Sequence, residues 1–384
     1  MNKKIRIVHL VLSASRTAGG LYYSVSGITR SLVSNSNDVY VFAGLDKINK
    51  SDYKIWDDNI NMIFFKKIGP NSFGYMPGLL YKLIKLNPDI LHIHGIWGYQ
   101  AFVASIIKLF LKNIKVVISP RGMLDTWSLK RSKFKKKTAL FFYVNRLLRI
   151  TDSIHTLNRF EKEVIKSKFT NAHRFFTLPN GVSSVDDTLK TDIAQKIKLI
   201  YIGRLHEKKG IELLINSMKT LKKKKKNFSL KIAGWGDNFY VNKLKALIEK
   251  NNLEDCVKLV GPLYNDKKKD FLRQAHVFIL PSFSEGLPMA VLECWSYGIS
   301  TFITRNCNFD IEMKMPFVQE INHFEDDIAE KLLKYIDYVK QNNFRQISKA
   351  AINHINKLYL WDILGKKLTT EYLSLINENN KNSK

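Results

Sequence analysis

The sequence predicts an α/β protein with two doubly wound domains, each built around a parallel sheet. The chain has 384 residues, 45% of them hydrophobic, which exceeds one usual core and is enough for two. Short β-branched runs alternate with longer segments of helical periodicity, a pattern typical of βαβ units. The alternation starts again after a polar stretch at residues 183–196, which indicates a linker between two domains.

The individual elements follow from the position of these runs. Strands of the first sheet are expected at residues 5–12, 37–43, 89–95 and 115–120, separated by helical segments such as 76–86 and 100–112. Strands of the second sheet are expected at residues 197–204, 228–236, 256–262, 276–282 and 299–304. The lysine run at 221–227 is expected to end a surface helix, and residues 377–384 to form a frayed tail.

Charge and cysteine content limit the class of protein. The net charge of +28 attracts polyanions, which include phosphorylated substrates, anionic lipid headgroups and nucleic acid. The same excess also fits the lysine usage of an AT-rich genome. Three cysteines without Cys-x-x-Cys spacing indicate neither a disulfide framework nor a zinc site, so a reducing cytoplasm is the expected compartment.

The N-terminal residues superficially resemble a secretory signal. Arg6 and His9 interrupt the apolar run, which favours a buried first strand instead. No stretch has the roughly 18 uninterrupted apolar residues that a membrane span needs.

Ligands of doubly wound sheets bind beyond the carboxyl ends of the strands, and a glycine-containing basic motif lies there, at residues 201–210. Gly203 permits a tight turn, while Arg204 and Lys209 place two cations near the start of the next helix. Such a helix start already favours anions, so the motif suits a diphosphate. The alternative is a turn with two solvated basic residues.

A second motif, at residues 281–298, contains two glutamates eight positions apart. Glu285 precedes a helix that Pro288 is suited to begin, with backbone N–H groups near Gly286 and Leu287 that point outward. Glu293 lies about a turn and a half into that helix. Each carboxylate can accept two hydrogen bonds from a vicinal diol. Alternatively, Glu285 supports the helix cap and Glu293 pairs with a nearby lysine.

The two motifs together resemble the retaining glycosyltransferases of family 4, which have the GT-B fold of two Rossmann-like domains facing a cleft. The resemblance covers almost the whole chain. It includes Gly19 and Gly20, segments 92–97, 118–130 and 178–182, both motifs above, and Trp361 at the start of the last helix.

This resemblance implies domain boundaries. Residues 1–183 would form the N-terminal acceptor-side domain, 184–196 the linker, and 197–358 the nucleotide-sugar-binding domain. Residues 359–384 would form a helix that crosses back to the first domain, followed by the tail.

The resemblance also implies site residues. Arg204 and Lys209 would bind the donor diphosphate and Glu293 its ribose. Glu285, with the amides of Gly286 and Leu287, would bind the transferred sugar. The loop of Gly261 and Leu263 would touch the base, and the Gly19–Gly20 loop would complete the donor site. Family members need no metal or other cofactor, and the chain has no Asp-x-Asp motif. The two cations would stabilise the leaving diphosphate instead.

One position departs from the family pattern. Arg121 stands where the family often has a histidine that orients the donor sugar, which puts the role of this residue in doubt. His94, near the end of the strand predicted at residues 89–95, is expected on the acceptor side, with a structural histidine as the alternative.

The acceptor side also carries a dense basic cluster, followed by an aromatic run, at residues 128–149. Such a segment can rest on an anionic membrane surface, which predicts peripheral attachment to the cytoplasmic face of the inner membrane. A lipid-diphosphate-linked glycan would be extended there. The alternative is a helix that buries the aromatic run and solvates its lysines.

The resemblance therefore predicts a cytoplasmic sugar transferase of bacterial O-antigen, lipopolysaccharide or capsule assembly, with a UDP-sugar as the preferred donor. A GDP-mannose-type mannosyltransferase of the same fold is an alternative. From a different class, a basic nucleic-acid-binding protein would explain the charge. No recognisable nucleic-acid-binding motif accompanies that charge, so nucleic acid is not an expected partner.

Overall fold

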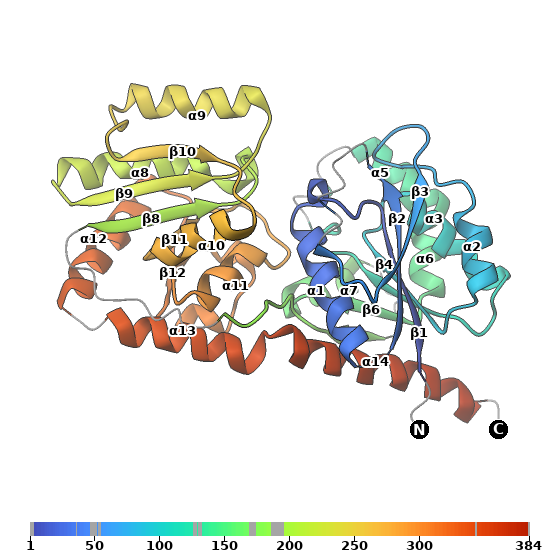
Figure 1. Ribbon diagram of the computed structural model, residues 1–384. Helices are drawn as coiled ribbons and strands as arrows, with labels where there is room; N and C mark the ends of the chain where they lie inside the picture. The colour runs from blue at the N-terminus through green and yellow to red at the C-terminus, as the bar shows by residue number, and fades with distance from the viewer. Residues whose placement is uncertain are drawn as a thin grey trace. The chain divides into compact units, whose positions relative to one another are not determined.

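A computed structural model of the chain describes residues 4–35, 37–46, 52, 55–125, 129, 133–168, 174–185, 196–341 and 344–382. It divides into two compact units (Figure 1). Unit 1 comprises Met1–Gly181 and Trp361–Lys384, and unit 2 comprises Val182–Leu360. Most of the segment expected to be a linker lies outside the described residues.

Unit 1 contains a seven-stranded sheet in the order β3-β2-β1-β4-β5-β6-β7, and every pair of neighbouring strands is parallel. Its strands are β1 (Arg6–Val11), β2 (Asp38–Leu45), β3 (Asn61–Lys66), β4 (Ile90–His94), β5 (Lys115–Ser119), β6 (Ser153–Thr156) and β7 (Phe175–Thr177). Parallel sheets of this kind are covered on both faces, and both faces are covered here.

The helices of unit 1 form the two covering layers. They are α1 (Gly20–Ser34), α2 (Leu79–Leu86), α3 (Tyr99–Ile106), α5 (Lys133–Ala139), α6 (Asn145–Ile150), α7 (Arg159–Lys168) and α14 (Trp361–Asn382), with a π-helical turn, η4 (Leu140–Val144), between α5 and α6. Short 3₁₀ turns are η1 (Arg16–Ala18) and η3 (Ile107–Leu109).

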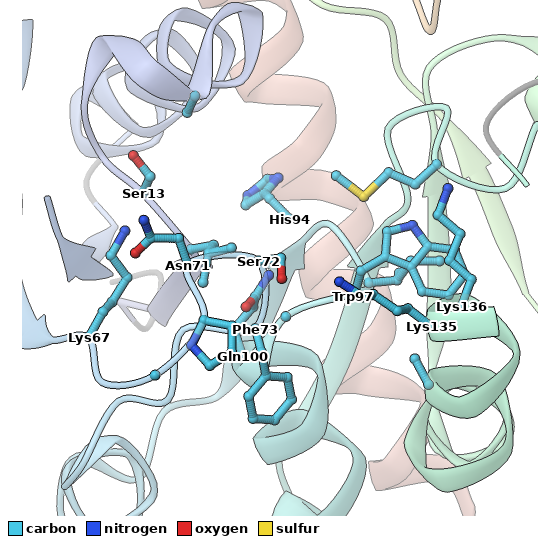
Figure 2. Close-up of a pocket in the computed structure, with 18 of the residues that line it drawn as sticks. Ser13, Lys67, Asn71, Ser72, Phe73, His94, Trp97, Gln100, Lys135 and Lys136 are labelled. Atoms are coloured by element: carbon cyan, nitrogen blue, oxygen red, sulfur yellow. The ribbon is translucent and has the colours of Figure 1, made fainter. Parts of the chain in front are cut away.

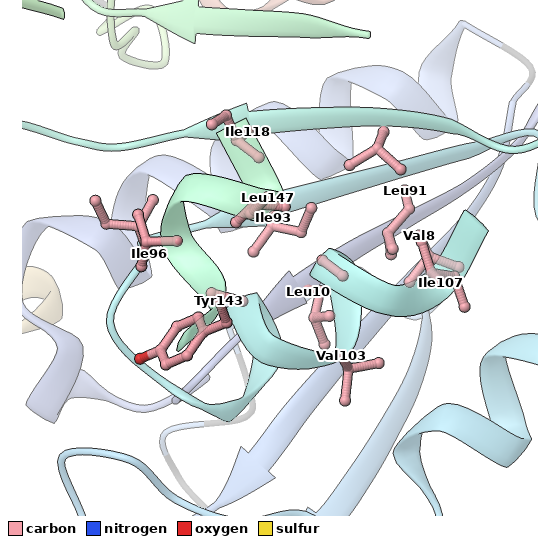
Figure 3. Close-up of a cluster of buried hydrophobic side chains, with 14 of the residues drawn as sticks. Val8, Leu10, Leu91, Ile93, Ile96, Val103, Ile107, Ile118, Tyr143 and Leu147 are labelled. Atoms are coloured by element: carbon pink, nitrogen blue, oxygen red, sulfur yellow. The ribbon is translucent and has the colours of Figure 1, made fainter. Parts of the chain in front are cut away.

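The larger core of unit 1 lies between the sheet and helices α2, α3 and α6 (Figure 3). Figure 3 shows Leu10, Leu91 and Ile93 of the sheet against Val103 and Leu147 of the helices. The opposite face of the sheet packs against α1 and α14. Successive side chains of each strand therefore point alternately into the two cores.

Helix α14 packs closely on α1 because glycines remove side chains from the contact. A Cβ atom on Gly27 would lie 2.2 Å from the Trp361 ring, and one on Gly365 would lie 1.9 Å from Ser31 Oγ. The Ser31 hydroxyl donates to the Trp361 carbonyl at 2.7 Å. The C-terminal helix is thus an integral part of unit 1.

Unit 2 contains a six-stranded parallel sheet in the order β10-β9-β8-β11-β12-β13. Its strands are β8 (Ile197–Ile202), β9 (Phe228–Ala233), β10 (Val257–Gly261), β11 (Val277–Leu280), β12 (Ser300–Ile303) and β13 (Val318–Glu320). Its helices are α8 (Ile211–Lys223), α9 (Asn238–Lys250), α10 (Asn265–Gln274), α11 (Met289–Ser296), α12 (Glu325–Gln341) and α13 (Phe344–Leu358), with 3₁₀ turns η5 (Glu207–Lys209), η6 (Arg305–Cys307) and η7 (Glu312–Lys314). Both units are Rossmann-like, which confirms the predicted fold class.

Several local predictions need correction. Strands β3, β6, β7 and β13 were not predicted, and three of these four have only three or four residues, too few to show a period. The prediction of a frayed tail at residues 377–384 is wrong for the residues up to Asn382, because α14 continues to that residue. Arg174 pairs with Glu378 there. Helix α8 ends at Lys223, which confirms the helix end expected from the lysine run.

Two further findings concern the cysteines and the hydropathy of the helices. Cys256, Cys294 and Cys307 are all buried and free. Among the described helices, none combines the length and the apolar character needed to cross a bilayer.

Candidate functional site

In unit 2, the two predicted motifs lie in contact beyond the ends of β8 and β11. Gly210, at the end of the first motif, has φ +66°, and a Cβ atom there would lie 2.2 Å from the Pro281 carbonyl oxygen. The Phe283 N–H and the Ser282 hydroxyl both donate to the Lys208 carbonyl, at 2.8 and 3.1 Å. The close approach therefore depends on a glycine, and it joins the two motifs into one structure.

Lys209 and Glu285 form an ion pair within this structure. Their Nζ and Oε1 atoms are 2.5 Å apart, and their side chains are 21% and 10% exposed. Asn308 Nδ2 donates to the carbonyls of Glu285 and Gly286, at 2.8 and 3.0 Å. The pair is thus largely shielded from water, and the backbone that carries Glu285 is fixed.

Glu293 also pairs with a lysine. Its Oε1 atom accepts from Lys268 Nζ of α10 at 2.7 Å, with both side chains at most 20% exposed. This is the alternative that the sequence left open for Glu293. The two glutamates that the motif places eight residues apart therefore each hold one lysine.

Arg204 lies apart from these ion pairs. Its guanidinium lies over the Trp235 ring, 5.1 Å from the ring centre, and it forms no salt bridge with any residue in the described ranges. Trp235 is itself 37% exposed. Arg204 and Lys209, which belong to one motif, therefore have different partners, the Trp235 ring and the Glu285 carboxylate.

The predicted base loop follows β10. Gly261 has φ +74°, and a Cβ atom added to it would meet open space, with nothing within 4 Å. The Gly261 carbonyl accepts from the Gly234 N–H at 2.9 Å. Leu263 is half-buried. The loop therefore lies beside the turn that carries Trp235.

In unit 1, four histidines gather at the carboxyl ends of the central strands. His9, His92, His94 and His155 are all at most 4% exposed. His9 pairs with His92 in the β1–β4 register, and His94 pairs with Ser119 in the β4–β5 register. Because side chains alternate along a strand, these residues share one face of the sheet.

The hydrogen bonds of this histidine network fix its tautomers. His155 Nε2 must donate to the Leu178 carbonyl (2.8 Å), so its Nδ1 accepts from Ser119 Oγ (2.7 Å). Ser119 in turn accepts from His92 Nε2 (2.7 Å), and His92 Nδ1 accepts from the hydroxyl of Tyr372 (2.5 Å) on α14. Each ring in this series is neutral.

A second series begins at Arg121. An arginine can only donate, so its Nη2 donates to His94 Nδ1 at 3.1 Å, and His94 Nε2 donates to His9 Nδ1 at 2.8 Å. The remaining His9 Nε2–H is buried and has no hydrogen-bond partner. Arg121 Nη1 also donates to Asn180 Oδ1 at 2.7 Å.

Burial and the nearby cation keep these rings uncharged. Burial, together with the positive charge of Arg121, lowers the pKa of His9 and of His155 to about 3. The same two causes contribute to holding the pKa of His92 and of His94 well below the usual value. Burial lowers the pKa of Arg121 to about 10, while the carboxylate of Glu161 opposes that change.

The ligand atoms of His9, His92 and His94 lie within 4.8 Å of one another, as metal ligands do. However, both nitrogens of His92 and of His94 already take part in hydrogen bonds, and the guanidinium of Arg121 contacts His94. The hydrogen bonds of the network therefore account for the close approach of these three rings without a bound cation.

A cavity of about 1350 Å³ lies beside His94 in unit 1 (Figure 2). Its polar lining includes Ser13, Asp46 and Lys67. Asp46 is bonded to both of these side chains and to Ser15 Oγ at 2.6 Å. Burial opposes ionisation of Asp46, but these hydrogen bonds outweigh it and lower its pKa. The predicted Gly19, with φ +60°, caps the start of α1 just after this segment, and Gly20 is the first residue of that helix.

The basic and aromatic segment forms one wall of the cavity and part of the surface. Lys135, Lys136 and Phe142 line the cavity, while Phe134, Phe141 and Phe142 are 69–83% exposed. Tyr143 and Val144 are buried. The aromatic run is therefore divided between core and surface, and residues 128 and 130–132 of this segment lie outside the described residues.

Sequence reasoning missed several residues of these sites. Trp235, Lys268 and Asn308 become neighbours of predicted residues only through the tertiary fold. The histidine network had a detectable signal, since His92 and His94 alternate on a predicted strand. The structure does not place the predicted residues of unit 1 relative to those of unit 2.

Comparison with solved structures defines the class of fold. Sucrose-phosphate synthase from Thermosynechococcus elongatus matches with a TM-score of 0.75 and 16% identity, covering 97% of this chain and 100% of that one. Anabaena HepE, in a crystal structure with UDP and glucose, matches with a TM-score of 0.74 and 15% identity, covering 96% and 99%. These similarities identify the fold as GT-B.

Sequence comparison identifies the family. The model described as Glycosyltransferase Family 4 matches residues 18–184, and the model described as Glycosyl transferases group 1 matches residues 189–354. The chain belongs to glycosyltransferase family 4, as its motifs predicted.

Two curated relatives illustrate the range of this family. The gpi3 subunit of phosphatidylinositol N-acetylglucosaminyltransferase from Schizosaccharomyces pombe is 23% identical over 84% of this chain and 69% of that protein. The amylovoran biosynthesis glycosyltransferase AmsK from Erwinia amylovora is 35% identical, but over only 29% of this chain and 28% of AmsK.

Proposed function

We propose that this glycosyltransferase moves a sugar from a UDP-sugar to a lipid-diphosphate-linked glycan in bacterial surface polysaccharide assembly. The observation that carries the donor assignment is the pairing of Lys209 with Glu285 at the joined motifs. The ammonium group is available to a diphosphate, and the ionised carboxylate can accept bonds from two sugar hydroxyls.

The proposed mechanism is transfer with retention of configuration and without a metal ion. Lys209 and Arg204 would stabilise the charge that develops on the leaving diphosphate. The leaving phosphate would itself accept the proton of the acceptor hydroxyl. Glu293 would accept hydrogen bonds from the ribose, with Lys268 orienting its carboxylate.

Two relatives support the choice of donor and pathway. HepE is described in complex with UDP and glucose, and AmsK is described as an amylovoran biosynthesis glycosyltransferase. Both statements concern those proteins and suggest, for this chain, a uridine nucleotide and a polysaccharide acceptor.

Binding of nucleotide-sugars by the full chain tests the donor assignment. In a panel of UDP- and GDP-sugars with EDTA present, we expect one UDP-sugar to raise the melting temperature. A ligand at 100 times its Kd adds about 2.7 kcal/mol to the free energy of unfolding. Glu293→Gln should weaken that stabilisation, whereas Glu249→Gln, an exposed change on α9, should not. The proposal fails if no nucleotide-sugar stabilises the protein, or if stabilisation requires a divalent ion.

We also propose that the exposed aromatic side chains of α5 and η4 attach the enzyme to the cytoplasmic face of an anionic membrane. Phe141 is 79% exposed, and Lys135, Lys136 and Lys137 precede it on the same segment. Each lysine near such a surface contributes about 1 kcal/mol.

Liposome flotation tests this attachment. Charge reversal of the three lysines should abolish binding to vesicles that contain phosphatidylglycerol, and Phe141→Ser should weaken it. The control is Phe239→Ser, because Phe239 is 80% exposed in unit 2. Equal flotation of all variants would refute the proposal.

A further inference from the structure

The unit 1 cavity has an uneven distribution of charge on its walls. Among the described residues that line it, three are lysines, Lys67, Lys135 and Lys136, and one is an acid, Asp46. Figure 2 shows Lys135 and Lys136 together on the side formed by Trp97, and Lys67 on the opposite side. Because Asp46 bonds to Lys67, the carboxylate belongs to the Lys67 side. The wall that α5 contributes therefore presents positive charge to the cavity.

The two lysines of this wall are placed by their surroundings. Lys136 Nζ lies over the Trp97 ring, 5.6 Å from its centre, and this cation–π contact favours one position of the ammonium group. Trp97 is fixed in turn, because its carbonyl accepts from the Tyr143 hydroxyl at 2.6 Å. Lys135 is exposed and forms no hydrogen bond or ion pair within the described part of the chain. Its three N–H donors are therefore available to a ligand in the cavity.

The cavity meets the molecular surface at η4. Phe142 lines the cavity and is also 69% exposed, so its ring borders both. The ring of Phe141 contacts that of Phe142, with centres 5.3 Å apart, and Phe141 is 79% exposed. An apolar surface and the two lysines thus belong to the same wall of the cavity.

The opposite side of the cavity is a polar site of fixed geometry. The Lys67 stem packs against two glycines, since a Cβ atom on Gly44 would lie 2.6 Å from its Cδ atom and one on Gly74 would lie 3.2 Å away. The side chains of Lys67 and Asp46 are 12% and 11% exposed, and the Ser13 hydroxyl also donates to Asp46. These donors and acceptors suit the hydroxyl groups of a sugar ring.

We infer that Lys135 and Lys136 form the subsite for the diphosphate of the lipid-linked acceptor, an inference that rests on the proposed function. The phosphate oxygens accept from the two ammonium groups. The lipid chain leaves the cavity over Phe142, and the first sugar lies towards Asp46 and Lys67. An apolar chain, an anion and a polar ring follow one another in such an acceptor, as the three parts of the cavity do.

The inference divides the lysines of α5 into two kinds. Lys137 is exposed and is not among the residues that line the cavity. It therefore attracts an anionic membrane but does not contact the acceptor diphosphate. Lys135 and Lys136 do both.

Geranyl diphosphate, which is soluble, serves as the probe of this subsite. Isothermal titration calorimetry of the full-length protein, with EDTA present, compares it with geraniol and with inorganic pyrophosphate. We expect geranyl diphosphate to bind most tightly. Lys135→Gln and Lys136→Gln should each weaken its binding about tenfold, as the loss of one charge-assisted hydrogen bond does. Lys137→Gln is the matched control and should bind it as the wild type does.

Two further comparisons separate the acceptor from the membrane. Phe142→Ser should remove the advantage of geranyl diphosphate over inorganic pyrophosphate, whereas Phe134→Ser, at a position that is 83% exposed and outside the cavity lining, should retain it. Vesicles that contain phosphatidylglycerol are the contrasting ligand. Replacement of Lys135, Lys136 or Lys137 by glutamine should weaken vesicle binding to a similar extent.

Four outcomes overturn the inference. Geranyl diphosphate fails to bind, or binds no more tightly than inorganic pyrophosphate. Lys137→Gln weakens its binding as much as the other two lysine changes, which would assign all three lysines to the membrane surface alone. Lys209→Ala in unit 2 abolishes its binding while the changes in α5 do not, which would place the diphosphate at the donor site. Binding of a UDP-sugar is measured on the same variants, so that failure of the donor assignment is recognised separately.

Discussion

The two Rossmann-like units carry different polar chemistry at the carboxyl ends of their sheets. In unit 1, neutral histidines form a dense, buried hydrogen-bonded network that also includes Ser119 and Tyr372. In unit 2, polar groups are paired as ions, Lys209 with Glu285 and Lys268 with Glu293. The same topology therefore supports either a neutral hydrogen-bonded network or a set of ion pairs.

The difference has a physical basis in desolvation. A charge without a partner is costly in a buried site, and a neutral hydrogen-bonded ring is not. Unit 1 keeps its rings uncharged even beside Arg121. The side chains of the unit 2 ion pairs remain 10–21% exposed, so their charges keep partial contact with water.

Acidification should affect the two units unequally, and this is the largest effect that we expect. Burial lowers the pKa of His9 and His155 to about 3 in the folded protein and holds the pKa of His92 and His94 well below the usual value. Just below pH 6.5, these four side chains therefore take up protons in the unfolded chain and not in the folded one. The free energy of unfolding of unit 1 should therefore fall as the pH drops below 6.5, by roughly 1.4 kcal/mol per pH unit for each histidine.

Hydrogen exchange resolved by peptide can measure this effect in the full chain. Peptides from β1 and β4 should lose protection between pH 7 and pH 5 more than peptides from β8 and β11, after correction for intrinsic rates. Equal loss in both units would show that the histidine network does not control the acid response.

Removal of the Lys209 ammonium group in unit 2 should reduce the rate of sugar transfer without unfolding the protein. Lys209→Ala is expected to lower turnover by about 10²- to 10³-fold, as loss of one group that stabilises developing charge does. Glu293→Ala should also lower turnover strongly, because the ribose loses its acceptor. The measurement is steady-state transfer with the donor found in the nucleotide-sugar panel.

Lys243→Ala is the matched control for the lysine change. Lys243 is ion-paired with Glu212 on the surface of unit 2, and exposed pairs of this kind contribute little. Wild-type turnover in Lys209→Ala would refute the donor-site assignment.

Loss of one hydroxyl from the unit 1 network should have the smallest effect. Tyr372→Phe removes the donor to His92 Nδ1 and should lower the free energy of unfolding by about 1 kcal/mol. Chemical denaturation at pH 7 measures the change, with Tyr81→Phe as the control because Tyr81 is 68% exposed. Identical stabilities of the two variants would show that the hydrogen bond between Tyr372 and His92 does not contribute to the free energy of unfolding.

The fold was largely predictable because its signal is local. Alternation of β-branched and helix-period segments located most strands of both sheets, and the restart after residue 183 indicated two domains. Strands β7 and β13 escaped detection because three residues are too few to show a period. Strands β3 and β6 also escaped detection.

The candidate sites were predictable only in part, because their partners are remote in sequence. Glycine and charge spacing located Lys209, Glu285 and Glu293. Nothing in the sequence indicated that Lys268, 25 residues away, would pair with Glu293. Trp97 lay in a recognised motif, yet its contact with Lys136 is visible only in the folded structure.

The docking of α14 on α1 has a consequence for synthesis of the protein. Unit 2 is continuous in sequence, whereas unit 1 needs residues from both its beginning and its end. At about 5–20 residues per second, a ribosome takes roughly ten to forty seconds to make the intervening segment. During that interval, the apolar side chains of Ile28 and Leu32 on the nascent chain lack the helix that covers them in the folded unit 1.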